Sequence, residues 1–351
     1  MVKSIASLGS LNGKTVLLRV DSDVDIENGK IVDDTRLLAS LDTLHHLLKK
    51  RADVNIIGHL GRPDPKDPES NSKNFTLEPV AQWFADKLKG KVKPITIGRL
   101  KAFEITNHIN LIENLRFFPE EEKNDPEFAR ELALLGDIYV DDAFAVSHRA
   151  HASIVGVTKY LPSYAGLHMQ NEIEELSKIL VNPKRPLAIL IGGAKIETKL
   201  PMVEKMHHVA DYVLVGGEIA EQDKVIIKVQ HEKIVGQKSA VVVSESTEDG
   251  KDIDQKSVEN FCQILGLANT IVWNGPVGFT DHGEKTERGT KALAEFIVST
   301  NAYKVVGGGD TLAYLSRLNL LDKFDFVSTG GGAMLEFLSG KELPGIKALE
   351  K

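Results

Sequence analysis

The chain has 351 residues, which is long for a single hydrophobic core and predicts two domains. Hydrophobic residues make up 42% and charged residues 26%, as in an ordinary globular protein, and the formal net charge of -7 argues against DNA or anionic lipid as a partner. The single cysteine, Cys262, excludes an intrachain disulfide and a cysteine metal cluster.

The first residues of the chain lack the charged start and the apolar stretch of a signal peptide. No apolar run approaches the length that spans a membrane. Together with the scarcity of cysteine, these features predict a protein of the reducing cytoplasm.

The first half of the chain alternates apolar runs with helical patterns. Runs at 16–20, 54–57 and 138–140 are continuous rather than alternating, which is typical of strands buried on both faces of a parallel sheet. Because a helical pattern follows each strand, the order predicts β–α units in a doubly wound sheet.

Three helices of the first half carry end signals. Asp34 can cap the first one, the pattern over 77–88 ends at Gly90, and Asp125-Pro126 starts a third helix that stops at Gly136. The apolar face of the first helix is expected to comprise Leu37, Leu38, Leu41, Leu44 and Leu48.

The centre of the chain predicts a helix over 170–181, set between two proline-containing turns. We interpret it as a connecting helix between two domains. The expected boundaries are a first domain over 1–162 with the tail 341–351 packing back on it, a connecting segment over 163–183 with a hinge, and a second domain over 184–340.

The second half repeats the strand–helix alternation and predicts a second sheet. Its apolar runs are 187–191, 212–215, 240–243, 270–273, 304–306 and 326–327. The expected fold class is therefore α/β, with two doubly wound parallel-sheet (Rossmann-like) domains joined by a connecting helix.

Ligands of open α/β sheets bind beyond the carboxyl ends of the strands, so the residues that follow each run are informative. In the first half these residues are aspartate, histidine and arginine, and a guanidinium matches phosphate and carboxylate bidentately. They are Asp21, His59, Arg62, Arg116, Asp142 and Arg149. This set predicts a site for a small anion.

Glycine turns follow the strands of the second half, and such turns let backbone amides and helix N-termini approach phosphates. The turns are Gly192-Gly193-Ala194-Lys195, Gly216-Gly217, Asn274-Gly275-Pro276, Gly307-Gly308-Gly309-Asp310-Thr311 and Gly330-Gly331-Gly332. The first half of the chain thus has the pattern of a site for an acidic metabolite, and the second half that of a site for a nucleotide. Together the two sites predict a transferase with two substrates. Neither GxxxxGK[ST] nor GxGxxG occurs, which disfavours a P-loop kinase and a nicotinamide dehydrogenase.

Two histidines three residues apart, His148 and His151, allow the alternative of a metal site. No matching cysteine or carboxylate spacing accompanies them, so a role in a polar network is the more ordinary interpretation.

Motifs along nearly the whole chain, in order, resemble the phosphoglycerate kinase family. They include Leu18-Arg19-Val20-Asp21, Asp33-Asp34-Thr35-Arg36, His59-Leu60-Gly61-Arg62-Pro63, Glu113-Asn114-Leu115-Arg116-Phe117, His148-Arg149-Ala150-His151, Trp273-Asn274-Gly275-Pro276 and Gly308-Gly309-Asp310-Thr311. The resemblance implies a kinase of glycolysis and gluconeogenesis. It would transfer the acyl phosphate of 1,3-bisphosphoglycerate reversibly to ADP, giving ATP and 3-phosphoglycerate, with Mg²⁺ as cofactor.

The resemblance also implies residue roles. Those implied to hold 3-phosphoglycerate are Asp21, Asp23, Arg36, His59, Arg62, Arg116 and Arg149, and those implied to act on the transferring group are Arg36, Lys195 and Lys199. Those implied to bind the nucleotide are Gly192, Gly193, Ala194, Lys195, Lys199, Gly216, Gly217, Asn274, Pro276, Gly278, Asp281, Gly308, Gly309, Asp310 and Thr311. Asp310 is also implied to hold Mg²⁺, and Gly330, Gly331 and Gly332 to aim a helix N-terminus at the transferred group.

Several positions depart from the family pattern. Asp23 stands where the family has asparagine, Thr198 replaces an aspartate, and the segment between Gly217 and Trp273 is shorter than usual. An ionised Asp23 is expected to repel the anionic substrate unless it turns away to pair with an arginine. The alternative function is a related binding protein with impaired catalysis.

We expect a monomer with small-molecule substrates and no nucleic-acid or membrane partner. The sequence leaves open the base preference and the nucleotide affinity, because the shortened segment lies near the expected adenine pocket. It also leaves open the effect of Asp23 and Thr198 on activity.

Overall fold

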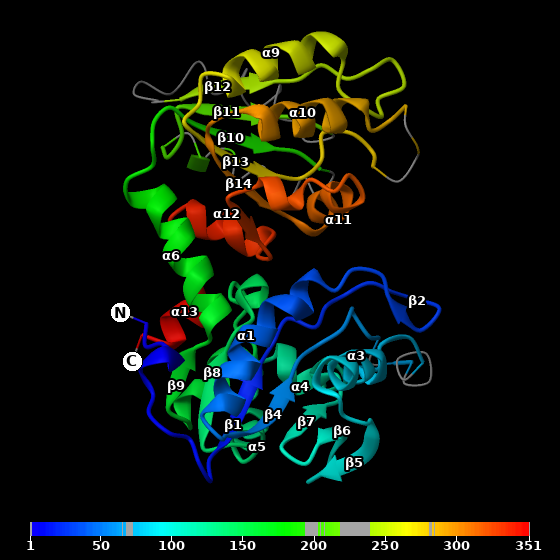
Figure 1. Cartoon of the computed structure of the whole chain (residues 1–351), viewed down its shortest axis with the longest axis vertical. Coiled ribbons are helices and arrows are strands. Elements are labelled where there is room, and N and C mark those ends of the chain that lie inside the picture. The colour runs from blue at the N-terminus through cyan, green and yellow to red at the C-terminus, as the bar shows by residue number, and fades with distance from the viewer. Residues whose placement is uncertain are drawn as a thin grey trace. The chain divides into compact units, whose positions relative to one another are not determined.

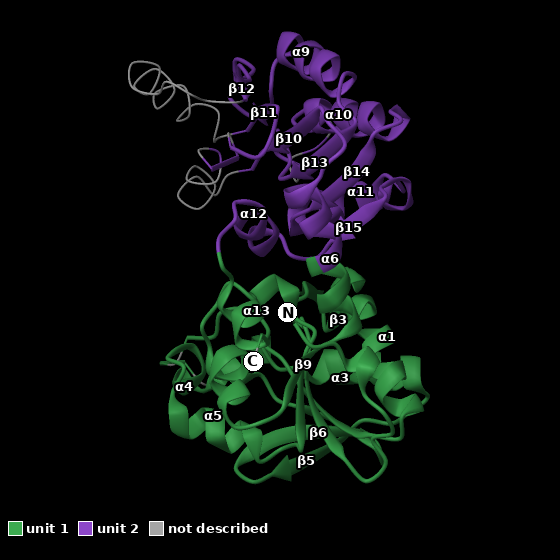
Figure 2. Ribbon diagram, turned by 90° about the vertical axis from the view of Figure 1, so that its left-hand side faces the viewer, with its two compact units in different colours: residues 1–173, 342–351 green, residues 174–341 purple. Residues whose placement is uncertain are grey.

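The computed structural model describes residues 2–64, 66–67, 73–193, 203, 205–206, 208–217, 239–280, 283 and 285–350. The chain divides into two compact units, of which the first comprises residues 1–173 and 342–351 and the second residues 174–341 (Figure 2). In the ranges described, no helix is both long and apolar enough to cross a membrane.

The described strands of the first unit form a seven-stranded sheet in the order β5-β6-β7-β4-β1-β8-β9 (Figure 1). The strands are β1 (Thr15–Arg19), β4 (Asp53–Ile57), β5 (Lys93–Ile97), β6 (Leu100–Thr106), β7 (Ile109–Ile112), β8 (Ile138–Asp141) and β9 (Ser163–Ala165). The strands from β7 to β9 run parallel, as predicted, whereas β5 and β6 add an antiparallel edge. A short hairpin, β2 (Ile26–Glu27) and β3 (Lys30–Ile31), lies outside this sheet.

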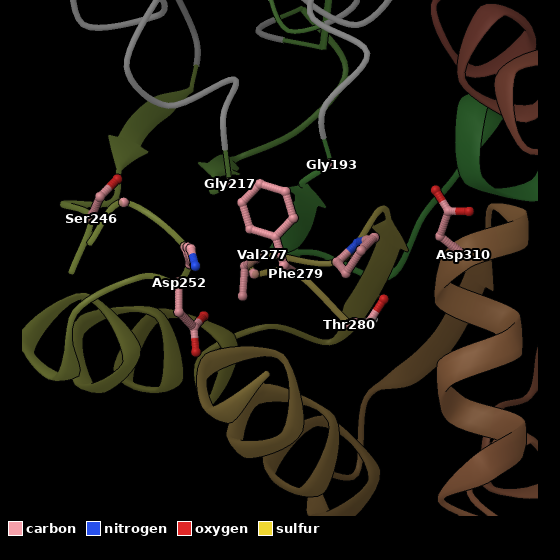
Figure 3. Close-up of a pocket in the computed structure, with 12 residues that line it drawn as sticks. Gly193, Gly217, Ser246, Asp252, Val277, Phe279, Thr280 and Asp310 are labelled. Atoms are coloured by element: carbon pink, nitrogen blue, oxygen red, sulfur yellow. The ribbon is translucent and has the colours of Figure 1, made fainter. Parts of the chain in front are cut away.

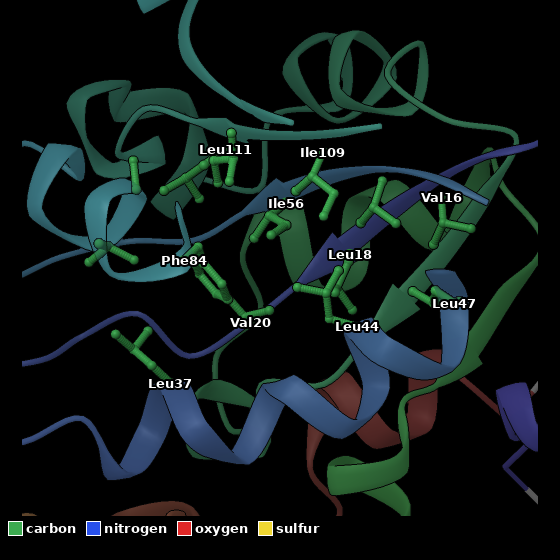
Figure 4. Packing of buried hydrophobic residues seen from close by; sticks show 14 of the residues in the cluster. Val16, Leu18, Val20, Leu37, Leu44, Leu47, Ile56, Phe84, Ile109 and Leu111 are labelled. Carbon is green, nitrogen blue, oxygen red and sulfur yellow. The ribbon is translucent and has the colours of Figure 1, made fainter. Parts of the chain in front are cut away.

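Helices α1 and α3 of the first unit cover the apolar side chains of the central strands. The helices of this unit whose full bounds are described are α1 (Thr35–Lys49), α3 (Glu78–Leu88), α4 (Pro119–Glu122), α5 (Pro126–Ala133), the start of α6 (Leu167–Val181) and α13 (Pro344–Ala348). Figure 4 shows Leu44 and Leu47 of α1 beside Val16 and Leu18 of β1, all of them buried. This packing holds the carboxyl ends of the strands in place beneath the site.

One detail of the predicted helix ends is wrong. Asp34 makes no capping hydrogen bond, because its Oδ2 accepts one of 2.9 Å from Trp83 Nε1, while Asp33 Oδ1 accepts from the backbone N–H of Thr35 at 2.9 Å. Helix α3 ends at Leu88, with Lys89 as a left-handed C-cap at a φ of 57° and Gly90 directly after it, which agrees with the predicted end. Gly90 is also required for close packing, since a Cβ there would lie 2.2 Å from the carbonyl oxygen of Ile105.

The predicted apolar face of α1 is also partly wrong. Leu38 is 43% exposed, and Leu47, Ser40 and Thr43 are buried in its place. The cap of α5 is confirmed, because Asp125 Oδ1 accepts from the backbone N–H groups of Glu127 and Phe128.

The second unit contains a six-stranded sheet, counted over its described strands, in the order β12-β11-β10-β13-β14-β15. The strands are β10 (Leu187–Ile191), β11 (Tyr212–Val215), β12 (Ala240–Val243), β13 (Thr270–Asn274), β14 (Tyr303–Gly307) and β15 (Phe326–Ser328), all paired in parallel. The helices whose full bounds are described in this unit are the end of α6, α9 (Gln255–Leu265), α10 (Arg288–Ser299), α11 (Gly309–Arg317) and α12 (Gly332–Leu338). The predicted fold class, α/β with two parallel sheets, is confirmed.

The register of the second sheet brings its strand ends to one edge. Ile191 of β10 pairs with Val215 of β11 and with Asn274 of β13, which in turn pairs with Gly307 of β14. Because the chain order reverses between β10 and β13, this edge opens a crevice at the switch point of the sheet.

Candidate active site

The first unit gathers aspartates, a histidine and arginines at the carboxyl ends of its parallel strands. Arg19 of β1 pairs in register with Ile57 of β4 and with Asp141 of β8, so the residues that follow these strands emerge at one edge. Asp21 follows β1 and His59 follows β4, and both are almost fully buried.

Arg36 lies in the first turn of α1 and faces two of these aspartates. Its Nη1 donates a hydrogen bond of 3.0 Å to the carbonyl oxygen of Asp23 and lies 3.3 Å from Asp21 Oδ2. The Asp21 carboxylate raises the pKa of Arg36. The guanidinium is therefore a fixed positive charge that remains 28% exposed and accessible to an anion.

Asp23 is held by groups of its own unit. Its Oδ1 accepts a hydrogen bond of 2.8 Å from the backbone N–H of Gly61, and its Oδ2 lies 3.7 Å from His59 Nε2 and 4.0 Å from Arg36 Nη1. Burial opposes ionisation of Asp23, but His59, Gly61 and Arg36 outweigh it and hold the pKa of this carboxyl well below its usual range. The Asp23 side chain is thus an ionised carboxylate that faces Gly61, His59 and Arg36 of its own unit.

Arg116 enters the same cluster through the loop after β7. Its Nη1 donates a hydrogen bond of 2.7 Å to the carbonyl oxygen of Gly61, and its Nε lies 3.2 Å from Glu122 Oε1. Arg62 adjoins Gly61, and both Arg62 and Arg149 are exposed. The contacts therefore connect five of the seven residues implied to hold the phosphoglycerate, namely Asp21, Asp23, Arg36, His59 and Arg116.

A buried polar layer beneath this cluster was missed by the sequence analysis. It consists of Arg19, Ser153 and Glu121, joined by Arg19 Nε donating to Ser153 Oγ at 3.1 Å and by Ser153 Oγ donating to Glu121 Oε1 at 2.5 Å. The sequence signals for it were the presence of Arg19 and of Ser153 in two of the family-like motifs.

Two other candidate side chains, Asp142 and His151, make contacts within the first unit. Asp142 faces the start of α6, where its Oδ1 accepts a hydrogen bond of 3.0 Å from the backbone N–H of Met169. His151 Nδ1 lies 3.9 Å from Glu121 Oε1, and burial followed by the charge of Arg116 lowers the pKa of His151 to about 3. His151 therefore takes part in the polar network.

The second unit contains a pocket of about 160 Å³ at the switch point of its sheet. Figure 3 shows the Phe279 ring in this pocket near Gly193 and Gly217, with Ser246 and Asp252 on one side and Asp310 on the other. Of the residues implied to bind the nucleotide, those that line the pocket are Gly193, Gly217, Pro276, Gly278 and Asp310. Lining residues that the sequence analysis missed are Ser246, Gly250, Lys251, Asp252, Val277, Phe279 and Thr280. Ser246 to Asp252 follow a predicted strand, which is the signal that could have identified them.

Hydrogen bonds between neighbouring turns fix the shape of this edge. Thr311 is fully buried and its Oγ1 accepts a hydrogen bond of 2.9 Å from the backbone N–H of Gly275, while Asn274 Nδ2 donates to the carbonyl oxygen of Gly331 at 3.1 Å. Gly308, with a φ of 100°, adopts the left-handed conformation that starts α11. The turn residues Gly192, Gly216 and Gly309 thus adjoin the pocket without lining it.

Asp310 is an exposed carboxylate in the first turn of α11 and lines the pocket. Within the part of the chain that the structure describes, no three potential metal-ligating side chains come together. An Mg²⁺ ion that takes one protein carboxylate and completes its shell with phosphate oxygens and water is compatible with this donor set.

The remaining implied residues Ala194, Lys195, Lys199 and Asp281 lie outside the described residues, as does Thr198.

A family model described as phosphoglycerate kinase matches residues 5–239 and 220–341 of the chain. A phosphoglycerate kinase of Dictyoglomus turgidum is 40% identical over 387 aligned residues, covering 97% of this chain and 96% of the relative. One from Borrelia garinii subsp. bavariensis is 36% identical over 400 aligned residues and covers all of both chains. Because that alignment is longer than the 351 residues of this chain, the relative contains residues that this chain lacks.

Two solved structures are similar to this chain. The structure of a phosphoglycerate kinase from Coxiella burnetii has a TM-score of 0.79 and 34% identity over 99% of both chains. That of an enzyme of the same name from Pyrococcus horikoshii OT3 has a TM-score of 0.82 and 28% identity over 99% of this chain and 98% of the other.

Proposed function

The chain belongs to the phosphoglycerate kinase family, and we propose that its first unit holds 3-phosphoglycerate while its second unit holds ADP or ATP. The chain is an enzyme that transfers a phosphoryl group reversibly between a carboxyl group and a nucleotide. None of the comparisons supports the alternative of a catalytically impaired binding protein.

The observation that carries the proposal is the cluster around Arg36. A substrate with a phosphate and a carboxylate needs several fixed cations. Arg36 and Arg116 supply two of them in the cluster, and the exposed Arg62 and Arg149 would add two more. Asp21 and the carbonyl oxygen of Asp23 anchor Arg36, so its orientation is set before the substrate arrives. Preorganised charge of this kind contributes strongly to phosphoryl transfer, because little covalent help is required.

For the nucleotide, the proposal rests on the pocket and the glycine turns of the second unit. The first N–H groups of α11 and α12 have no acceptor within their own helices, and the glycines before them allow phosphate oxygens to approach. Gly331 and Gly332 would present such amides to the transferred group, whereas the N–H of Gly330 donates to Ser328 Oγ at 3.1 Å and would hold the turn in place. Lys195 and Lys199 would neutralise the transferred group, as the family resemblance implies.

Asp310 would hold Mg²⁺, which neutralises phosphate charge when bound. The Asp310 carboxylate lines the pocket and is exposed, so a hydrated cation can reach it. Thr311 is fully buried and would contribute by holding the Gly275 turn, whose backbone N–H donates to the Thr311 hydroxyl oxygen. We further propose that the enzyme acts as a monomer in the cytoplasm.

A coupled steady-state assay tests the proposed function. Purified protein supplied with MgATP and 3-phosphoglycerate should form ADP and an acyl phosphate, with saturation in each substrate. No turnover by folded protein at saturating concentrations of both substrates would refute the proposal.

A further inference from the structure

Arg19 is a buried cation beneath the cluster around Arg36, and the family resemblance implied no role for it. It ends β1 and is 1% exposed. Its Nη2 lies 3.0 Å from His59 Nδ1, its Nε donates to Ser153 Oγ, and its Nη1 donates to the carbonyl oxygen of Val20. These contacts fix the guanidinium against the inner edge of the His59 ring.

The contact between Arg19 and His59 decides where the imidazole carries its proton. A guanidinium is a donor and never an acceptor, so His59 Nδ1 must accept through its lone pair. A neutral ring that accepts at Nδ1 carries its proton at Nε2. A protonated ring would place a second donor against Arg19, and burial together with Arg19 and Arg116 lowers the pKa of His59.

The Nε2 side of the ring faces the anionic part of the site. His59 Nε2 lies 3.7 Å from Asp23 Oδ2, which is beyond hydrogen-bond distance but close enough for attraction between an N–H and a carboxylate. The opposite tautomer would present a lone pair to Asp23 and an N–H to Arg19. Both contacts would then be repulsive.

Arg19 is itself held in place by a chain of hydrogen bonds. Ser153 Oγ donates to Glu121 Oε1, so its lone pairs remain for Arg19 Nε, and the backbone N–H of Ser153 donates to Glu121 Oε2 at 2.9 Å. Tyr139 fixes the same residue by donating its hydroxyl proton to the carbonyl oxygen of Ser153 at 2.7 Å. Glu121 is 1% exposed; burial raises the pKa of its carboxyl group, and the charge of Arg19 is the largest effect that opposes this rise.

We propose that Arg19 is a positioning residue that holds His59 as the Nε2–H tautomer, so that the ring offers a donor to Asp23 and to the anionic substrate. Arg19 acts through His59 and does not touch the substrate. The effect on substrate binding rests on the proposed function, whereas the assignment of the tautomer does not.

Nitrogen-15 NMR of the imidazole rings in the wild-type enzyme tests the tautomer directly. The chain has 11 histidines, so the His59 resonances are assigned from their loss in His59→Gln. A protonated Nε2 and an unprotonated Nδ1 are expected for His59 across neutral pH. A protonated Nδ1 in the wild type would overturn the proposal, whether or not any Arg19 variant folds.

Arg19→Met removes the donors and keeps a long side chain, and Arg19→Lys keeps the charge with a single ammonium. We expect Arg19→Met to lose the pure Nε2–H signature and to raise KM for 3-phosphoglycerate by about 10-fold, with little change in KM for ATP. Arg19→Lys should recover part of the Nε2–H signature and part of the affinity for 3-phosphoglycerate. A folded Arg19→Met enzyme with an unchanged tautomer and an unchanged KM would contradict the proposal.

Arg99→Met is the matched control, because Arg99 is a half-exposed arginine of the same unit whose partner is Glu131. It should leave the His59 spectrum and both KM values unchanged. If the wild-type enzyme shows the Nε2–H signature but transfers no phosphoryl group, the proposed function fails while the tautomer assignment stands.

Discussion

Asp23 Oδ1 accepts a hydrogen bond of 2.8 Å from the backbone N–H of Gly61, and this bond joins the loop after β1 to the loop after β4. The sequence offered two interpretations of Asp23, repulsion of the substrate or retreat into a contact with the protein. In the structure the carboxylate is satisfied by its own unit and still lies 4.0 Å from Arg36 Nη1. It therefore reduces the positive charge that Arg36 presents to a substrate.

Replacing Asp23 with asparagine should tighten binding of 3-phosphoglycerate. The amide oxygen can keep the Gly61 bond, while removal of the negative charge restores the full effect of Arg36. We expect KM for 3-phosphoglycerate to fall by about 5-fold, since solvent screens a contact at this partly exposed site. KM for ATP should not change. A rise in KM for 3-phosphoglycerate would show that the carboxylate is part of the binding site.

Arg36→Ala should lower kcat by about 100-fold, the loss that accompanies removal of one preorganised donor to developing charge. Arg36→Lys should recover little of the lost kcat. The planar guanidinium can contact Asp21, the Asp23 carbonyl and a phosphoryl group at the same time, whereas a lysine ammonium cannot. Thermal unfolding of both variants is the control for folding. A change confined to KM would reduce Arg36 to a binding residue.

Asp310→Asn should weaken binding of the magnesium–nucleotide complex and leave binding of 3-phosphoglycerate nearly unchanged. An amide oxygen is a poorer ligand for a hard cation than a carboxylate. Titration calorimetry measures the affinity of each variant for MgADP, for ADP in the presence of a chelator and for 3-phosphoglycerate. The three affinities show whether the loss depends on the metal. Equal losses for the two substrates would argue against a metal role.

We expect the stability of the first unit to depend on pH because of Asp142. Burial raises its pKa to about 7, whereas in the unfolded chain it titrates near 3.8, so between these values the folded state binds more protons. Stability contributed by Asp142 is therefore present at low pH and is lost as the pH rises towards 7. Asp142→Asn keeps an acceptor for the Met169 N–H but cannot ionise.

The measurement is denaturant unfolding of wild type and Asp142→Asn, followed by Trp83 fluorescence with both proteins carrying Trp273→Phe. From pH 5 to pH 7.5 the free energy of unfolding of the variant should gain about 2 kcal/mol relative to that of the wild type. Asp141, whose pKa burial raises to about 6, is present in both proteins, but its charge also raises the pKa of Asp142, so Asp141→Asn and the double variant complete a cycle that separates the two carboxyl groups. If the free energies of unfolding of the two proteins changed equally with pH, the expected role of Asp142 would be contradicted.

The central strands were predictable because burial on both faces leaves continuous apolar runs. The run at 187–191 coincides with β10, and the run at 16–20 is displaced by one residue from β1. The edge strands β5 and β6 were not predicted, since β5 is largely exposed and has no such run. The cap of α1 was mispredicted because Trp83, which is 49 residues away in the chain, binds Asp34.

For the candidate site, the rule that ligands bind at strand ends identified residues that the fold brings together, such as Asp21, His59 and Arg116. The layer beneath them could not be predicted in the same way. Arg19 and Ser153 are 134 residues apart, and each alone resembles an ordinary polar residue. Similarly, Lys251 and Asp252 line the pocket of the second unit without any glycine-turn motif of their own.

The most direct test of the central claim is trapping of the acyl phosphate. Purified enzyme is incubated with MgATP, 3-phosphoglycerate and hydroxylamine, which converts an acyl phosphate to a hydroxamate and drives the reaction forward. The predicted result is equal amounts of ADP and hydroxamate, formed only when both substrates are present and strongly reduced in Arg36→Ala. Absence of hydroxamate from folded enzyme that binds both substrates by calorimetry would contradict phosphoryl transfer to the carboxylate.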